Sequence, residues 1–110
     1  MEKFEGYIEI HKGIMKKVLE EGFGKSPVRF QEILLYYRGK LEDGNIFDTN
    51  LDNDLPHRFV LGLGQVIKGW EFVLATMKMN EKCFVCIPSE FAYGPKGNPP
   101  IIPPNSPVYF

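Results

Sequence analysis

Proline placement constrains this chain more than any other feature of its sequence. Residues 88–107 hold seven of the nine prolines, together with two glycines. Because proline disrupts helix interiors and the hydrogen-bond ladders of central strands, this stretch cannot be a regular element. It is also too long for an ordinary connection, so it is either a functional loop or a disordered one. Its apolar residues Phe91, Tyr93, Ile101 and Ile102 favour a packed loop, because disordered segments are depleted in such residues.

The motif Pro100-Ile-Ile-Pro103 near the end of this loop has a second interpretation. A proline-rich segment can adopt a polyproline helix and act as the ligand of a recognition domain. We favour the packed loop, because flanking elements hold it at both ends.

The rest of the chain predicts short strands and one helix. The expected strands are residues 14–19, the apolar run 33–41, a return strand from residue 46, residues 58–61 and residues 83–88. Asp43-Gly44 predicts a hairpin after the second of these strands, because glycine accepts a positive φ. Between Val66 and Met77, apolar residues recur at spacings of one, three and four, which indicates a helix. One short helix on an antiparallel sheet of four to five strands is an α+β fold.

Composition and charge limit the domain count and the partners. A chain of 110 residues, of which 44% are hydrophobic and 14% aromatic, can build one compact core. With 13 basic and 14 acidic residues the net charge is -1, so nucleic acid is not an expected partner. No window approaches the roughly 18 apolar residues of a membrane span or resembles a signal peptide. We therefore expect no membrane partner and a cytoplasmic or nuclear location.

Cys83 and Cys86 form a Cys-x-x-Cys motif, which in redox proteins opens a helix. Here the motif lies in an expected strand, where residues three apart point to opposite faces. A structural pair of half-buried thiols is favoured over a redox or metal role. Only His11 and His57 remain as further ligands of the kinds that zinc prefers, so we expect neither a metal nor a cofactor.

Three segments carry a family resemblance. They are Tyr37-Arg-Gly-Lys-Leu-Glu-Asp-Gly-Asn-Ile-Phe-Asp48, Gln65-Val-Ile-Lys-Gly-Trp-Glu71 and Phe91-Ala-Tyr-Gly-Pro-Lys-Gly-Asn-Pro-Pro-Ile-Ile-Pro-Pro-Asn105. Together they resemble the FKBP-type peptidyl-prolyl cis/trans isomerases, the macrolide-binding immunophilins, with nearly constant spacing. The resemblance implies an isomerase domain over residues 13–110, with residues 1–12 as an N-terminal extension. It also implies a twisted antiparallel sheet wrapped around one short helix.

The resemblance implies a pocket that holds a proline ring, with Trp70 as its floor. The catalytic set would be Tyr37, Phe47, Asp48, Ile67, Trp70, Tyr93 and Phe110, with ligand contacts from His57, Gln65, Val66, Ala92, Ile101 and Ile102. In the family, the N–H at the position of Ile67 and the hydroxyl at that of Tyr93 bond to ligand carbonyls. The implied ligands are proline-containing peptides, protein clients and macrolides of the tacrolimus and rapamycin type.

Such a pocket suits a reaction that breaks no covalent bond. Rotation about an X-Pro bond must overcome a barrier of ~18–20 kcal/mol from amide resonance, and it needs no nucleophile or metal. The twisted amide is less polar than the planar one, so an apolar pocket favours the transition state. The alternative is a non-catalytic binding, adaptor or chaperone module of the same fold. The retained aromatic residues Tyr37, Phe47, Trp70 and Tyr93 favour catalysis.

Four positions depart from the common family pattern. Asn53 replaces an arginine that supports the aspartate matching Asp48, and Gln65 stands where glutamate is frequent. Pro100 replaces a glycine at the loop tip, through which drug-bound family members contact calcineurin or the rapamycin-target kinase. His57 stands where a pocket phenylalanine is usual.

His57 introduces an expected pH dependence. An unperturbed imidazole becomes charged below about pH 6.5, and burying an uncompensated cation costs more than burying a neutral ring. Macrolide binding should therefore weaken as the pH falls. The alternative is that His57 points to solvent near Asp52 or Asp54.

The last residues, Pro107-Val-Tyr-Phe110, have the pattern of a strand that has just begun. Family members continue this strand for several residues. We therefore expect a monomeric domain that belongs to a longer protein and that lacks the end of its last strand here.

Overall fold

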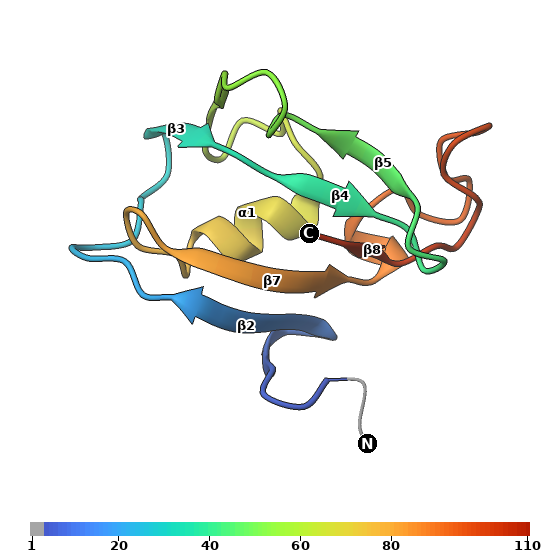
Figure 1. Ribbon diagram of the computed structural model, residues 1–110, viewed down its shortest axis with the longest axis horizontal. Coiled ribbons are helices and arrows are strands. Elements are labelled where there is room, and N and C mark those ends of the chain that lie inside the picture. The colour runs from blue at the N-terminus through green and yellow to red at the C-terminus, as the bar shows by residue number, and fades with distance from the viewer. Residues whose placement is uncertain (1–3) are drawn as a thin grey trace.

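The computed structural model describes residues 4–110 and contains one α-helix packed against antiparallel strands (Figure 1). The strands are β1 (Ile8–His11), β2 (Ile14–Glu20), β3 (Glu32–Leu35), β4 (Arg38–Lys40), β5 (Ile46–Thr49), β6 (His57–Val60), β7 (Lys82–Ile87) and β8 (Val108–Tyr109). The helix α1 spans Lys68–Leu74, and a short 3-10 helix, η1, spans Ser89–Phe91. The α+β class and the single short helix are thus confirmed.

The strands form two sheets in place of the expected one sheet of four to five strands. The larger has six strands in the order β1-β2-β7-β8-β4-β5, and β3 pairs with β6 in the smaller. Residues 8–11, which we expected to lie in an N-terminal extension, form the edge strand β1 and pair with β2. At the other end of the chain, β8 lies between β7 and β4, and the backbone of Phe110 exchanges two 2.9 Å hydrogen bonds with Val85.

The apolar run 33–41 is two strands, which belong to different sheets. The side chain of Asn50 stabilises the break, because it binds backbone groups on both sides. Its Oδ1 accepts the N–H of Tyr37 at 2.8 Å, and its Nδ2 donates to the carbonyl of Leu35 at 2.8 Å. Between β3 and β4, where backbone groups have no neighbouring strand as a partner, the buried side-chain amide of Asn50 therefore supplies their hydrogen bonds. The hairpin predicted at Asp43-Gly44 joins β4 to β5, and Gly44 has a φ of 90°.

The helix is shorter than the periodic segment 66–77 that predicted it. Ile67 is its N-cap, with an extended ψ of 149°, and Ala75 is its C-cap. Val66 and Ile67 therefore belong to the loop before the helix. Their apolar side chains fit the helical spacing but contribute to a surface pocket rather than to a helical face.

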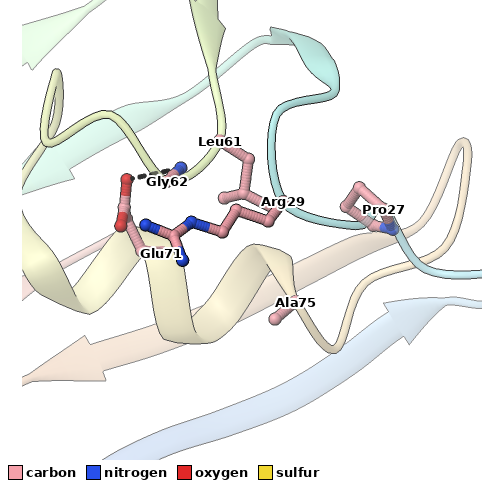
Figure 2. A pocket seen from close by; sticks show the side chains of 6 residues that line it. All are labelled: Pro27, Arg29, Leu61, Gly62, Glu71 and Ala75. Atoms are coloured by element: carbon pink, nitrogen blue, oxygen red, sulfur yellow. Dashed lines mark hydrogen bonds between the residues drawn. The ribbon is translucent and has the colours of Figure 1, made fainter.

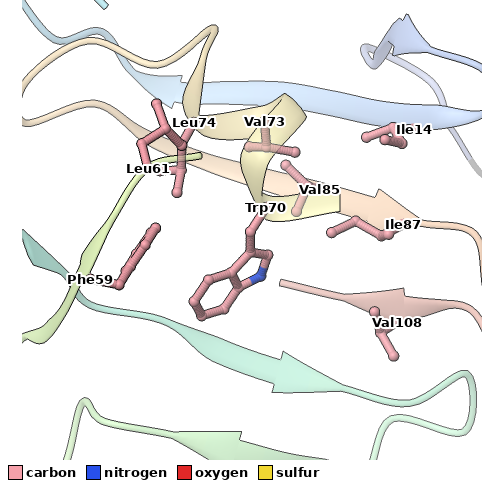
Figure 3. Packing of buried hydrophobic residues seen from close by; sticks show 9 residues of the cluster. All are labelled: Ile14, Phe59, Leu61, Trp70, Val73, Leu74, Val85, Ile87 and Val108. Atoms are coloured by element: carbon pink, nitrogen blue, oxygen red, sulfur yellow. The ribbon is translucent and has the colours of Figure 1, made fainter. Parts of the chain in front are cut away.

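The core lies between α1 and the larger sheet (Figure 3). Trp70, Val73 and Leu74 of the helix pack with Ile14, Val85, Ile87 and Val108 of the strands, together with Phe59 and Leu61. Gly69 lets the helix approach β7 closely, because a Cβ at this position would overlap the side chain of Ile87. Trp70, the next residue, is thereby held in the core, where it is 9% exposed.

The proline-rich segment is packed, as its apolar content predicted. Ile102 is 2% exposed, and its backbone exchanges two hydrogen bonds with Asn98. Ile101 differs from this expectation, because 58% of its surface is exposed. The loop is therefore folded on its own backbone, with one of its two isoleucines buried.

The two cysteines lie in β7, where Cys83 pairs with Val18 and Cys86 pairs with Met15 of β2. Neither forms a disulfide bond. Burial raises the pKa of Cys83 to about 11, which disfavours the thiolate that redox chemistry needs. The geometry agrees with a structural role for the motif. Within residues 4–110, no helix is long and apolar enough to cross a membrane.

Candidate active site

A surface pocket of about 170 Å³ lies beside Trp70, and its lining residues lie between positions 37 and 110 of the chain. The nine lining residues are Tyr37, Phe47, Asp48, His57, Val66, Ile67, Trp70, Tyr93 and Phe110. The structure thus brings together all seven residues of the expected catalytic set, with two of the expected ligand contacts, His57 and Val66. The volume is below the roughly 300 Å³ that marks the lower end of drug-sized sites, so the pocket suits one ring-sized group.

Aromatic rings pack edge to face around the pocket and hold one another in place. The Trp70 ring lies 4.8 Å from that of Tyr37 and 5.2 Å from that of Phe110. Phe47 continues the wall, at 5.8 Å from Phe110 and 6.2 Å from Tyr93. Each contact has the T-shaped geometry that aromatic quadrupoles favour. The pocket is therefore formed before any ligand arrives.

Gly39 supports this wall and was not among the expected site residues. It is buried in β4, and a Cβ built on it would lie 2.7 Å from Phe47 and 2.8 Å from Phe110. Both rings rest on its backbone, so any side chain would displace them. A glycine inside a strand often marks such a close approach, and this signal in Tyr37-Arg-Gly-Lys was available in the sequence. Phe59 was also missed; its ring lies 6.1 Å beneath Trp70.

The one carboxylate of the pocket is bound to a tyrosine. The hydroxyl of Tyr37 donates to Oδ2 of Asp48 at 2.6 Å. Burial, this hydrogen bond and the charge of Asp48 together raise the pKa of Tyr37. Burial and the same charge also raise the pKa of Tyr93. Both phenols are therefore held in the protonated form, which is able to donate a hydrogen bond.

Asn53 does not take over the expected role of an arginine at its position, which would be to bind Asp48. Its Oδ1 accepts the N–H of Leu55 at 3.3 Å, within its own turn. Among residues 4–110, no lysine or arginine forms an ion pair with Asp48. Tyr37 is its hydrogen-bond partner instead.

Two hydrogen-bond donors at the pocket have no partner in the described part of the chain. One is the hydroxyl of Tyr93, and the other is the backbone N–H of Ile67 at the N-cap of α1. Both residues line the pocket. Because no group within residues 4–110 binds these donors, they are available to ligand carbonyls.

The other four expected ligand contacts, Gln65, Ala92, Ile101 and Ile102, do not line the pocket. Gln65 accepts the N–H of Val60 at 2.8 Å and so braces the loop before α1. Ala92 precedes Tyr93 and is half-buried, Ile101 is exposed, and Ile102 is in the interior of the loop. His57 does line the pocket, with its ring 6.2 Å from Tyr37 and 6.1 Å from Trp70.

A second depression, of about 330 Å³, lies between α1 and the segment before β3 (Figure 2). It contains no aromatic side chain. Its walls are Pro27, Arg29, Leu61, Gly62, Glu71 and Ala75. The carboxylate of Glu71 is already bound, because it accepts the N–H of Gly62 at 3.0 Å. Although this depression is larger, the aromatic pocket combines a cavity lined by rings with two hydrogen-bond donors and is the candidate site.

No group of three or more potential metal ligands occurs within the described residues. The pocket itself contains a single carboxylate and a single imidazole. Its chemistry is therefore that of apolar enclosure with a few hydrogen bonds.

Comparisons with known proteins agree on one family. Residues 24–110 match the sequence profile of the FKBP-type peptidyl-prolyl cis-trans isomerases. An FK506-binding protein of Neisseria meningitidis serogroup B is 44% identical over 98 residues, which are 89% of this chain and 90% of that protein. FK506-binding protein 59 of Drosophila melanogaster is 41% identical over 99 residues, but this chain spans only 23% of its length.

Solved structures agree with this relationship. A peptidyl-prolyl cis-trans isomerase from Pseudomonas syringae pv. tomato superposes with a TM-score of 0.85 at 35% identity, covering 94% of this chain and 74% of that one. The N-terminal domain of FKBP42 from Arabidopsis thaliana gives a TM-score of 0.87 at 26% identity, covering 94% and 84%. The chain belongs to the family of FKBP-type peptidyl-prolyl cis-trans isomerases.

Proposed function

We propose that this domain is a peptidyl-prolyl cis/trans isomerase and that the aromatic pocket is its active site. The observation that carries the proposal is the pocket itself, in which a ring-sized apolar cavity adjoins two free donors. The cavity is suited to the pyrrolidine ring of a proline. Family membership supports the same reaction.

Apolar enclosure supplies the first part of the catalysis. The rings of Trp70, Phe47 and Phe110 surround the proline and exclude water from the X-Pro bond. Twisting this bond removes its resonance and lowers its polarity, so the twisted form loses less than the planar form on leaving water. A million-fold acceleration needs about 8 kcal/mol, at about 1.36 kcal/mol for each factor of ten.

Hydrogen bonds supply the second part. The N–H of Ile67 binds one carbonyl of the substrate and holds the chain beside the twisting bond. Tyr93 donates to a second carbonyl, because burial and the charge of Asp48 raise the pKa of its phenol and keep it protonated. These donors are fixed to α1 and to the packed loop, so little reorganisation is needed when the substrate binds.

A proline-isomerisation assay on Leu-Pro and Phe-Pro peptides tests this proposal. We expect wild-type protein to accelerate exchange, and Trp70→Ala or Phe47→Ala to lower kcat/KM at least tenfold while the domain stays folded. Phe84→Ala is a matched control, since Phe84 is 49% exposed in β7 and does not line the pocket. A folded wild type that exchanges peptides at the uncatalysed rate would contradict catalysis and support a binding or adaptor module.

Macrolides of the tacrolimus and rapamycin type are proposed as ligands of the same pocket. Only one ring-sized part of such a molecule fits a volume of about 170 Å³, so the rest must lie over the rim. Rapamycin should therefore inhibit isomerisation competitively, and Trp70→Ala should weaken both processes together. Protein clients, a monomeric state and the cytoplasmic or nuclear location stay predictions.

A further inference from the structure

His57 is the only lining residue of the pocket with a basic side chain. Its ring contacts Tyr37 and Trp70 edge-on and lies 5.6 Å from Phe59, so three aromatic rings fix its position. The residue is nonetheless exposed. Neither ring nitrogen has a hydrogen bond or ion pair with any residue in the described range. The imidazole is therefore free to bind a ligand at the rim.

Tyr37 separates His57 from the only carboxylate of the pocket. Its ring contacts the imidazole, and its hydroxyl donates to Asp48. The rim thus has an anionic end at Asp48 and a hydrogen-bonding, protonatable end at His57. A substrate with one charged side chain beside its proline would be attracted at one end and repelled at the other.

We propose that His57 makes the pocket prefer proline-containing segments that carry a carboxylate beside the proline, and that this preference strengthens as the pH falls. The inference rests on the proposed function, since it concerns the substrates of the same pocket. Neutral imidazole donates one hydrogen bond, whereas the charged form donates two and can pair with a carboxylate. An apolar residue beside the proline of the substrate gains no interaction with the charged imidazole, and it loses part of its contact with that ring.

Other charged groups around His57 leave it available. Glu32 on β3 pairs with Arg58, at 3.7 Å on the exposed surface, Asp52 and Asp54 lie in the segment before β6, and α1 carries Lys68 and Glu71. None of their side chains binds the imidazole. Asp48 on β5 is bound to Tyr37, and Glu71 to Gly62. Asp48 would repel an acidic side chain, so the carboxylate must lie on the side of the proline that faces β6.

Isomerisation of matched peptides tests the inference. The peptides carry Glu, Gln or Leu either directly before or directly after the proline, and kcat/KM is measured at pH 8 and pH 5.5. Glutamate in a peptide ionises near pH ~4.3, so it stays charged at both values. For one of the two positions we expect the Glu/Gln ratio to rise about two- to fivefold on acidification, which is the range of an exposed ion pair. The rate for Leu should fall over the same interval.

Three variants assign these effects to one side chain. His57→Phe and His57→Gln should both remove the pH dependence of the Glu/Gln ratio, and Gln keeps the polarity without the charge. Arg58→Gln is the control, because Arg58 lies on the same strand with 68% of its side chain exposed and does not line the pocket. It should leave the ratio unchanged. An equal pH profile in wild type and His57→Phe would overturn the inference.

A separate readout distinguishes this inference from the proposed function. Peptide affinities measured by chemical-shift titration report the Glu/Gln preference even if the domain accelerates no exchange. Absence of catalysis with a pH-dependent preference for Glu would overturn the isomerase proposal alone. Catalysis with equal affinities for Glu and Gln peptides at pH 5.5 would overturn the role of His57 alone.

Discussion

Gly39 shows how a single residue can decide the shape of the pocket. The ring of Phe47 comes from β5 and that of Phe110 from the residue after β8, and the two meet over the backbone of Gly39. A Cβ at 2.7 Å from one ring and 2.8 Å from the other would force both to move. A side chain at position 39 would therefore change the positions of two rings that line the pocket.

Gly39→Ala should consequently damage stability and activity together. Overpacking a well-ordered core costs about 1–3 kcal/mol, and the displaced rings would no longer enclose a proline. Urea unfolding and the isomerisation assay measure the two effects. Gly24→Ala serves as a control for activity alone, because nothing lies within 4 Å of its Cβ position but its φ of +78° makes an alanine there strained and costs stability. Normal kcat/KM in a folded Gly39→Ala protein would show that the rings do not need this support.

The hydrogen bond between Tyr37 and Asp48 predicts a dependence of stability on alkaline pH. Folding raises the pKa of Tyr37 and Tyr93, so the native state holds their protons more tightly than the unfolded state does. This contribution is fully present below about pH 10, the ordinary value of tyrosine, and is lost as the pH rises above it. Asp48→Asn should lower both pKa values and flatten this loss.

Phenolate absorbance and urea unfolding between pH 9 and pH 11.5 test the prediction. Asp52→Asn removes an exposed carboxylate outside the pocket and should behave as wild type. Indistinguishable phenolate titrations in wild type and Asp48→Asn would remove Asp48 as the cause.

At the scale of elements, a buried ion pair connects β2, the end of α1 and the start of β7. Nζ of Lys16 lies 2.6 Å from Oε2 of Glu81, and the two side chains are 5% and 6% exposed. The same Nζ donates to the carbonyl and the hydroxyl of Thr76, at 3.2 and 2.9 Å. The cation is therefore well solvated by protein groups, although it is almost without water.

Lys16→Met should destabilise the domain by about 3–5 kcal/mol, because it leaves the carboxylate of Glu81 buried without its partner. The pair formed by Lys82 and Glu20 is the control, with 3.7 Å between its charged atoms and about 70% exposure of each side chain. Lys82→Met should cost about 0–1 kcal/mol. Urea unfolding measures both. Equal losses in the two variants would show that burial adds nothing to the first pair.

At the scale of the whole molecule, strand β1 (Ile8–His11) connects the N-terminal segment to the rest of the fold. β1 adds an edge strand to the larger sheet, and its His11 stacks on Phe72 of α1 at 3.9 Å. The same imidazole lies 5.4 Å from Phe91 in η1. Strand, helix and the start of the pocket loop therefore meet at one aromatic cluster.

Deleting residues 1–12 should consequently destabilise the domain more than deleting residues 1–7. Only the longer deletion removes β1 and His11, and an aromatic pair contributes about 0.5–1.5 kcal/mol beyond the area it buries. His11→Ala in the full chain should give a loss of about 1 kcal/mol. Thermal and urea unfolding of the three proteins test this. If both truncated proteins unfold at the same denaturant concentration as the full chain, β1 is dispensable.

Much of the fold and of the site could be predicted because its signals are local. The helix was visible in the spacing of Trp70, Val73 and Leu74, and the hairpin in Asp43-Gly44. The pocket residues were identified by family resemblance, which depends on spacing along the chain. The helix boundaries were wrong by two residues at the start and by three at the end. At the start, Val66 and Ile67 are apolar but line the pocket and do not belong to the helix.

Other features are invisible in any local window. By itself the sequence determined one helix, a packed proline-rich loop and a set of aromatic residues that line one pocket. Only the tertiary structure decided that Asn50 divides the run 33–41 between two sheets, that Gly39 supports two pocket walls and that Lys16 meets Glu81. The physical reason is that these contacts join residues between 8 and 71 positions apart in the chain. Their contacts, and the burial that gives those contacts their energy, exist only once the sheet has folded around its helix.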